Sequence, residues 1–261
     1  MRSLSIAATG MLAQQLNVEV VSNNIANLNT TAYKRQRAEF QDLLYQNLKR
    51  KGVQSSDAGT LVPSGVQVGV GVRTAAVYRV SEQGNLTSTE NTYDIAIQGQ
   101  GFYRILLPSG QEAYTRAGSF QLNPQGQLVT NNGFVVQPSV TIPRDATSVT
   151  INSSGQVQVK LDGQVAPQTA GQIELATFAN ESGLEAIGDN LLLETPASGT
   201  ASTGTPGGPG FGSVLQGFLE TSNVNPVSEI TALIQAQRAY EMNSRVITTS
   251  DEMLRTVSTL R

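Results

Sequence analysis

The N-terminal segment of the chain reads LSIAATGMLAQQLNVEVVSNNIANL over residues 4–28. Two sets of positions in it repeat every seven residues: Leu4, Met11, Val18 and Ile25, and Ala7, Gln14, Val21 and Leu28. A seven-residue apolar repeat with one polar interruption is typical of a coiled-coil seam. We therefore predict a long helix over residues 1–32. It should end near Asn29, Thr30 and Thr31, whose side chains compete for backbone hydrogen bonds.

The C-terminal segment carries a matching pattern. Asn225 is placed to cap a helix, Pro226 suits its first position, and Glu229 lies in its first turn. Two sets of residues then recur every seven positions: Leu233, Tyr240, Ile247 and Leu254, and Ala236, Asn243, Ser250 and Val257. We predict a second long helix over residues 223–261, and we expect the two helices to pair as a coiled-coil-like inner domain.

The middle of the chain, residues 72–222, is predicted to be a mainly β domain. From Val66 to Val80 every second residue can face a core, which indicates one long strand or two consecutive strands. Further short strands are expected over residues 94–98, 102–107, 127–130, 149–151, 157–161, 173–178 and 191–194. Short strands separated by turn sequences are typical of an antiparallel sandwich or barrel.

Two stretches have no clear period. Residues 33–71 are predicted to be an extended linker region, and their polar part, residues 46–65, is longer than a compact domain tolerates without a use. A linker and a functional extension fit that composition equally. Residues 196–212 are rich in Pro and Gly, so we predict a flexible surface loop beside the β domain.

The composition argues against an enzyme. The chain has no His and no Cys, which removes the commonest general base, the thiolate nucleophile and zinc sites built on imidazole or sulfur. A hydrolase that uses paired carboxylates remains the alternative. The carboxylates of the β region show no recognisable pairing; they are Asp94, Glu112, Asp145, Asp162 and Glu174. We predict no catalytic residue, no cofactor site and no metal site.

The charge and hydropathy of the chain exclude two further classes of protein. A net charge of -3 argues against nucleic-acid binding, which needs a concentrated basic face. The sequence has no apolar run of about eighteen residues, so no segment is predicted to insert into a membrane. The N-terminus also lacks the apolar core and cleavage site of a secretory signal peptide.

The N-terminal helix carries very little charge. Residues 1–33 contain only Arg2 and Glu19 as charged side chains, whereas a surface helix normally carries charge on its wet face. We therefore expect the helix to be contacted on more than one side, with other copies of the chain supplying the additional contacts. Packing along its own β domain is the alternative. A membrane-surface helix would need Lys and Arg along one face, and this helix lacks them.

Three separated motifs carry a family resemblance. Residues 23–34 (NNIANLNTTAYK) resemble the N-terminal signature of the flagellar axial family of rod, hook and hook-associated proteins. Residues 233–243 (LIQAQRAYEMN) and 249–254 (TSDEML) resemble its C-terminal signature, and the middle is similar at 99–103 (GQGFY) and 114–120 (YTRAGSF). The length and the stretch at 46–65 are most similar to the distal-rod members.

The resemblance implies a structural subunit that self-assembles into a rigid hollow helical tube, with the terminal helices around an export channel and the β domain outside. Such a tube transmits motor torque across the periplasm to the hook. A hook subunit or a proximal or middle rod subunit is the alternative. The implied partners are other copies, rod subunits below, hook subunits above, the L- and P-ring proteins, and the type III export apparatus that exports the chain without a cleavable signal peptide.

The resemblance also assigns residues to two roles. The residues expected in self-assembly are Leu4, Met11, Val18, Val21, Asn23, Asn24, Ile25, Asn27, Leu28, Leu233, Gln237, Arg238, Tyr240, Asn243, Ile247, Leu254 and Val257. The residues expected to stiffen the rod are Gln46, Lys49, Arg50, Val53, Leu61 and Pro63. One position departs from the family pattern, because many members have Gly where this chain has Ala32. We therefore expect an ordinary backbone conformation at Ala32.

Overall fold

A computed structural model of the chain describes residues 2–49, 64–163 and 166–259. The chain divides into two compact units. Unit 1 takes in Met1–Ala26, Gln36–Tyr78 and Asn225–Arg261, and unit 2 takes in Asn27–Arg35 and Arg79–Val224.

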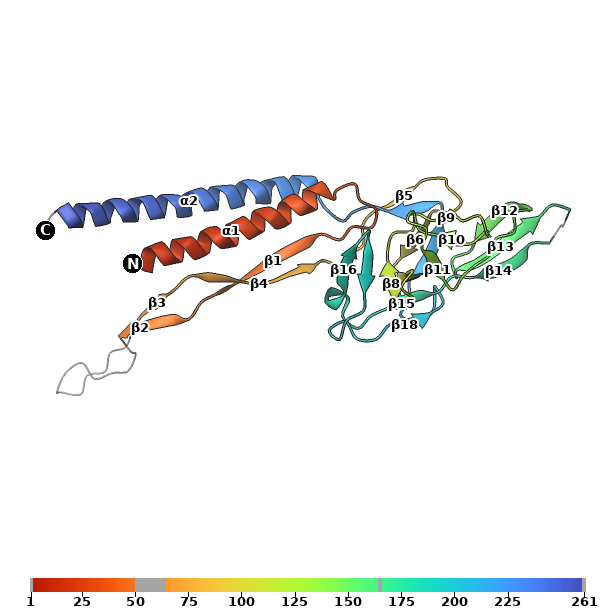
Figure 1. The fold of residues 1–261 in the computed structure, drawn as a ribbon, viewed down its shortest axis with the longest axis horizontal. Coiled ribbons are helices and arrows are strands. Elements are labelled where there is room, and N and C mark those ends of the chain that lie inside the picture. The colour runs from red at the N-terminus through yellow and green to blue at the C-terminus, as the bar shows by residue number, and fades with distance from the viewer. Residues whose placement is uncertain (1, 50–63, 164–165, 260–261) are drawn as a thin grey trace. The chain divides into compact units, whose positions relative to one another are not determined.

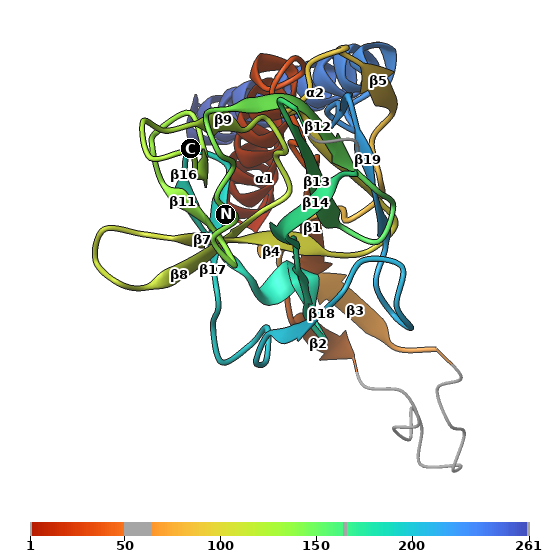
Figure 2. The ribbon, with the colours of Figure 1, turned by 90° about the vertical axis from the view of Figure 1, so that its right-hand side faces the viewer.

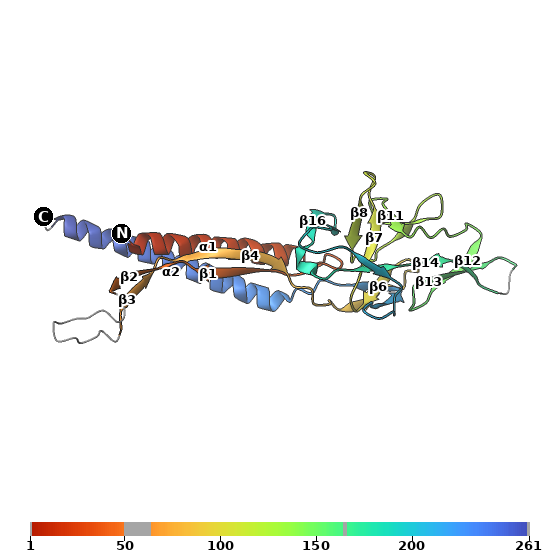
Figure 3. The same cartoon turned by 90° about the horizontal axis from the view of Figure 1, so that it is seen from below.

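Unit 1 contains both long helices, α1 (Arg2–Ala26) and α2 (Pro226–Thr259). Asn225 caps α2 as predicted, since its Oδ1 accepts a 3.0 Å hydrogen bond from the backbone N–H of Val227. The two helices lie side by side in Figure 1 and in Figure 3. They run antiparallel, because Ser250 of α2 bonds Ser3 at the start of α1, whereas Glu229 bonds Asn24 near its end.

Unit 1 also holds two pairs of strands. They are β1 (Gln36–Asp42) with β4 (Val72–Arg79), and β2 (Tyr45–Lys49) with β3 (Val66–Gly69). Strand β1 packs along α1. The alternation from Val66 to Val80 is confirmed as two consecutive strands, β3 and β4. Gly71 separates them with a φ of +127°, a backbone conformation that favours Gly.

Unit 2 is built around a nine-stranded antiparallel sheet in its described residues. Its strands follow the order β16-β17-β8-β7-β11-β10-β9, and β15 pairs with both β7 and β18. Their bounds are β7 (Phe102–Leu106), β8 (Glu112–Thr115), β9 (Gln121–Leu122), β10 (Leu128–Val129), β11 (Val135–Gln137), β15 (Leu175–Thr177), β16 (Glu185–Gly188), β17 (Leu191–Leu193) and β18 (Ser202–Gly204).

Smaller antiparallel sheets complete unit 2. Figure 2 shows β12 (Ala146–Ile151), β13 (Gln156–Leu161) and β14 (Gln168–Gln172) next to one another in a sheet with that order. The remaining pairs are β6 (Ile95–Gln98) with β19 (Ser213–Gln216), and β5 (Leu86–Ser88) with β20 (Phe218–Glu220). A short 3₁₀ helix, η1, covers Glu181–Gly183.

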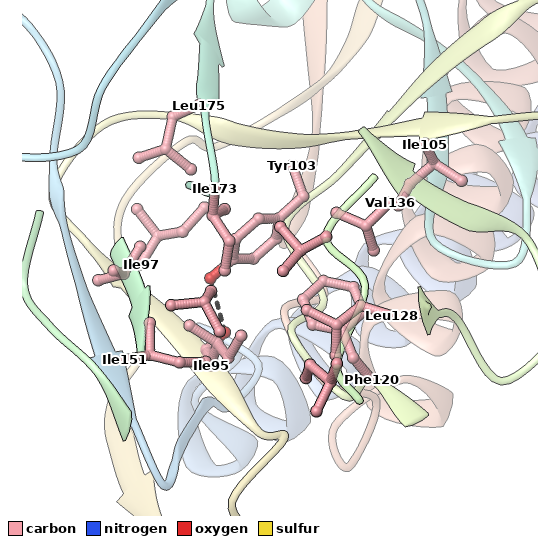
Figure 4. Close-up of a cluster of buried hydrophobic side chains, with 14 of the residues drawn as sticks. Ile95, Ile97, Tyr103, Ile105, Phe120, Leu128, Val136, Ile151, Ile173 and Leu175 are labelled. Carbon is pink, nitrogen blue, oxygen red and sulfur yellow. Dashed lines mark hydrogen bonds between the residues drawn. The ribbon is translucent and has the colours of Figure 1, made fainter. Parts of the chain in front are cut away.

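The core of unit 2 lies between these sheets. Tyr103 and Phe120 are almost completely buried in it, with ring centroids 5.0 Å apart in an edge-to-face arrangement. The phenol of Tyr103 donates a 2.7 Å hydrogen bond to the carbonyl oxygen of Ile95, the dashed line in Figure 4. Burial raises the pKa of the Tyr103 phenol, with smaller and opposite contributions from Arg116 and Glu220, so the phenol stays protonated and can donate this bond.

The observed elements confirm a mainly β chain with a helix at each end. Each strand expected between residues 94 and 194 has a counterpart, with ends shifted by a few residues. Helix α1 ends at Ala26 and is followed by turns up to Ala32, somewhat earlier than expected. Within the described residues, neither helix is long and apolar enough to cross a membrane.

Candidate assembly surface and a buried ion cluster

The face of α2 that contacts α1 repeats every seven residues. Glu229, Ala236 and Ser250 are buried on it, and Asn243 lies so close to Gly10 of α1 that a Cβ built on Gly10 would be 2.8 Å from Nδ2. Three of these positions belong to one of the two predicted repeats. The seven-residue pattern therefore describes a contact inside one subunit, at which small residues let the helices approach closely.

Asn24 ties three elements of unit 1 together. Its Nδ2 donates to the carboxylate of Glu229 at 3.1 Å and to the carbonyl oxygen of Gln36 at 2.9 Å, and its Oδ1 accepts from the Gln36 N–H at 2.8 Å. Asn24 is 1% exposed and Glu229 is 4% exposed. The amide side chain thus makes hydrogen bonds to the backbone of β1 and to a buried carboxylate of α2 at the same time.

The residues predicted for self-assembly differ in exposure. Those on the N-terminal side are buried at Val21 and Asn24, exposed at Asn23, and half-buried at Leu4, Met11, Val18, Ile25, Asn27 and Leu28. Those on α2 are half-buried at Leu233, Asn243, Ile247 and Leu254, and exposed at Gln237, Arg238, Tyr240 and Val257. The role of all of these residues in assembly stays a prediction.

A second set of apolar residues on α2 includes Val257, a predicted assembly residue, but its other members were missed by the sequence reasoning. They are spaced three, four, seven or eight positions apart, which places neighbouring members on adjoining sides of the helix. Their exposed fractions run from 46% at Ile234 to 72% at Val227. We call them the exposed α2 row: Val227, Ile230, Ile234, Met242, Val246, Met253 and Val257. The helical spacing was visible in the sequence but was masked by the stronger seven-residue repeat.

A groove of about 370 Å³ lies between the two helices of unit 1. Gln15, Val18 and Glu19 line it from α1, and Gln237, Tyr240 and Glu241 line it from α2. Val18, Gln237 and Tyr240 are among the predicted assembly residues, so the structure brings three of them together at one surface.

The predicted stiffening residues are only partly described. Gln46 lies exposed in β2, where it pairs with Val68 of β3, and Lys49 is the last residue of that strand. Arg50, Val53, Leu61 and Pro63 lie outside the described residues. Large apolar side chains on these two strands and just before them are exposed; they are Leu44, Tyr45, Leu48 and Val66.

An ion cluster is buried in unit 2 around Glu220, whose side chain is 1% exposed. One carboxylate oxygen accepts from Nε of Arg116 at 2.6 Å, and the other accepts from Nζ of Lys34 at 2.6 Å and from the Gly84 N–H at 2.9 Å. Burial lowers the pKa of the Lys34 ammonium from its ordinary value, and the neighbouring Glu220 opposes that shift.

Backbone groups complete the cluster. The guanidinium of Arg116 donates to the carbonyl oxygens of Gly101 at 3.0 Å and Gly99 at 2.5 Å. The carbonyl oxygen of Glu220 accepts a 2.8 Å hydrogen bond from the Ala32 N–H. Residues of the sequence motifs at 23–34 and 114–120 therefore meet at Glu220, which belonged to no motif, and Arg116 connects them to the motif at 99–103.

The expectation for Ala32 is wrong. Its φ is +56°, a left-handed conformation that favours Gly. Ala32 is buried, and its N–H is held by Glu220. The surrounding hydrogen bonds therefore impose a backbone conformation that the residue itself disfavours.

Three of the five carboxylates considered for a hydrolase have structural partners. Glu112 and Glu174 flank the same side chain, Arg104, at 3.5 and 2.9 Å. Asp94 accepts hydrogen bonds from Thr89 at 2.6 Å and Asn91 at 3.1 Å within a turn. Among the described residues no group of three or more His, Cys, Asp or Glu side chains is placed to hold a metal ion.

Comparisons with known proteins agree with the sequence motifs. Three family models match the chain: "Flagella basal body rod protein" at residues 4–34, "Flagellar hook protein FlgE/F/G D1 domain" at 96–159, and "Flagellar basal body rod FlgEFG protein C-terminal" at 215–260. A flagellar basal-body rod protein FlgG of Caulobacter vibrioides is 65% identical over 100% of both chains. Those of Agrobacterium fabrum and Bacillus subtilis are 52% and 40% identical, and each alignment covers at least 98% of both chains.

Proposed function

The chain belongs to the FlgG family of flagellar basal-body rod proteins, and we propose that copies of it form the distal rod by joining through α1 and α2. As a member of that family it is a structural subunit of the flagellar basal body. The helices pair as a coiled-coil-like inner domain, residues 1–32 and 223–261, and line a hollow tube that encloses the export channel. The β domain, residues 72–222, lies outside.

The single observation that carries this proposal is the exposed α2 row. Helix α2 exposes seven apolar side chains to solvent along its length, which is typical of a surface that binds another protein. The groove beside Val18 and Tyr240 offers a second surface on the two helices for such contacts. Head-to-tail contacts of this kind, repeated with a rotation that does not close, give a helical polymer.

The rod proposal extends to partners and to stiffness. The tube transmits torque across the periplasm, contacts rod subunits below and hook subunits above, turns inside the L- and P-ring proteins, and receives its subunits from the flagellar export apparatus. The segment 33–71 is a linker whose stretch at 46–65 braces neighbouring copies. Deleting residues 46–65 should give a more flexible polymer, and an unchanged bending persistence in electron micrographs would contradict this role.

The assembly surface is tested by making it polar. A Met242→Ser, Val246→Ser double variant should stay folded, because both side chains are mostly exposed, at 61% and 46%. It should fail to polymerise at concentrations where the unmodified chain forms filaments, as measured by light scattering and electron microscopy. The matched control is Leu106→Ser, Ile187→Ser, which removes two exposed apolar side chains of unit 2. Equal polymerisation of both variants would rule out α2 as the adhesive surface.

A further inference from the structure

The chain passes between unit 1 and unit 2 at four places, after residues 26, 35, 78 and 224. Three of these crossings adjoin segments of unit 2 that hydrogen-bond to one another: residues 32–35, 80–84 and 220–223. We call these three segments the collar. Every residue of the collar belongs to unit 2, so the contacts among its segments lie within one compact unit.

Asn223 joins its own segment of the collar to the other two. Its Oδ1 accepts a 2.7 Å hydrogen bond from the Arg35 N–H, and its Nδ2 donates to the carbonyl oxygens of Val80 at 3.0 Å and Glu82 at 2.9 Å. Its backbone N–H donates to the carbonyl oxygen of Tyr33 at 3.3 Å. One half-buried amide side chain therefore makes hydrogen bonds to both of the other segments.

Further bonds close the collar. The first and second segments bond each other directly, because the Val80 N–H donates to the carbonyl oxygen of Arg35 at 2.8 Å. The buried carboxylate of Glu220, in the third segment, bonds Lys34 of the first and the N–H of Gly84 of the second. Each segment is thus bonded to the two others, and the bonds of such a network can stabilise more together than they do one at a time.

We propose that the collar is a mechanical clamp, in which a load that enters unit 2 along one segment is divided among all three. Residues 220–223 can move away from unit 2 only if their bonds to both other segments break. The inference rests on the proposed rod function, because a subunit that transmits torque carries such a load at each crossing between its two units. Asn223 is the positioning residue of the clamp.

Pulling on single molecules of the full chain tests the clamp. The chain has no Cys, so two introduced Cys residues attach handles at defined positions. Thr231→Cys on α2 and Lys160→Cys on β13 replace exposed side chains and load the crossing after residue 224. Asn223→Ala removes three side-chain hydrogen bonds. It should raise the rate of the first rupture at a fixed force at least about tenfold, since one ordinary bond contributes up to about that factor.

Asn123→Ala is the matched control. Asn123 is also half-buried in unit 2, and its side chain also makes three hydrogen bonds, to Gln125 and Gln127, in a turn outside the collar. Its loss should change the rupture rate little. A second pair of handles, Ser109→Cys with Lys160→Cys, loads a part of unit 2 that excludes the collar. There Asn223→Ala should rupture at the force measured for the unmodified chain, which a general loss of stability would not give.

A second variant keeps the test decisive if Asn223→Ala does not fold. Asn223→Asp retains the acceptor for the Arg35 N–H and loses the two donated bonds, so its rupture rate should exceed that of the unmodified chain with the handles at 160 and 231 alone.

Two results would overturn the clamp: equal rupture rates for Asn223→Ala and Asn123→Ala, or an equal effect of the Asn223 variants with both pairs of handles. These measurements use single subunits, so they do not depend on polymer formation. Failure of the unmodified chain to polymerise would instead overturn the proposed assembly, and with it the load that the clamp is proposed to carry.

Discussion

Nε of Arg116 lies 2.6 Å from a carboxylate oxygen of Glu220, although the two residues are 104 positions apart in the chain. The other oxygen of the same carboxylate binds Lys34, which comes 186 residues before it. Because Glu220 is 1% exposed, its charge is stabilised almost entirely by these partners and by the Gly84 N–H. The segment that leaves α1 and the segment that leads to α2 are therefore joined through one buried carboxylate.

Glu220→Gln should strongly destabilise unit 2. The substitution removes the carboxylate that Lys34 and Arg116 share, and breaking such a buried cluster typically costs about 3–5 kcal/mol. Urea unfolding of the isolated subunit measures the loss. The control is Glu112→Gln at the solvent-accessible pair with Arg104, where the expected change is below about 1 kcal/mol. If the two variants lost similar free energies of unfolding, the buried cluster would contribute no more to stability than the solvent-accessible pair.

Asn24→Ala should lower the stability of the subunit even where no polymer forms. The change removes the hydrogen bonds of Asn24 to the Gln36 backbone groups and to the Glu229 carboxylate, and a buried group that loses its partner costs about 1–3 kcal/mol. We expect a loss of about 3 kcal/mol in denaturant unfolding, against less than about 0.5 kcal/mol for Gln15→Ala on the exposed side of α1. A role of Asn24 in contacts between copies alone would leave the isolated subunit unchanged.

The terminal helices could be predicted because their signals are local. The seven-residue repeat, the Asn225 cap and Pro226 act within a few turns of α1 and α2, and the structure places these elements where the pattern does. A strand with alternating apolar residues, such as β13, was found for the same reason. Strands β1 and β2 were not, because their polar sequences alternate weakly and their order comes from pairing with β4 and β3.

The contacts that position the candidate sites could not be predicted, because they join distant residues. No pattern near Glu220 indicates that it meets Lys34 and Arg116. The stretch 196–212 also differs from the flexible loop expected from its Pro and Gly content, since Ser198 is 1% exposed and β18 pairs with β15. The order of this stretch depends on the sheet beside it.

Ala32→Val should lower the stability of unit 2, whereas Ala32→Gly should change that stability little. A β-branched side chain at a φ of +56° is a steric outlier, and we expect a loss of about 2 kcal/mol or more. Gly relieves about 1–2 kcal/mol of strain. It also gives up a buried methyl worth about 0.8 kcal/mol and adds backbone entropy to the unfolded chain. Thermal unfolding compares the variants, and a large gain for Ala32→Gly would mean that more strain is stored there than the backbone angle implies.

Ionisation of the Tyr114 phenol should lower the stability of the fold at high pH. Burial, with a smaller contribution from the Glu112 carboxylate, raises the pKa of its phenol to about 12. Because the unfolded phenol ionises near about 10, the native state holds its proton longer. This stabilisation is complete below about pH 10 and is lost as the pH rises to about 12.

The Tyr114 contribution is measured as a difference between the unmodified chain and Tyr114→Phe, because Lys34 and Tyr103 also have shifted pKa values. The unfolding free energy of the unmodified chain should fall more steeply than that of Tyr114→Phe above about pH 10, and tyrosinate absorbance should lose one late-titrating group in the variant. Glu112→Gln should lower the pKa of Tyr114, since the carboxylate contributes to the shift. Parallel free-energy curves for the unmodified chain and Tyr114→Phe would mean that the phenol ionises at the same pH in the folded and unfolded states.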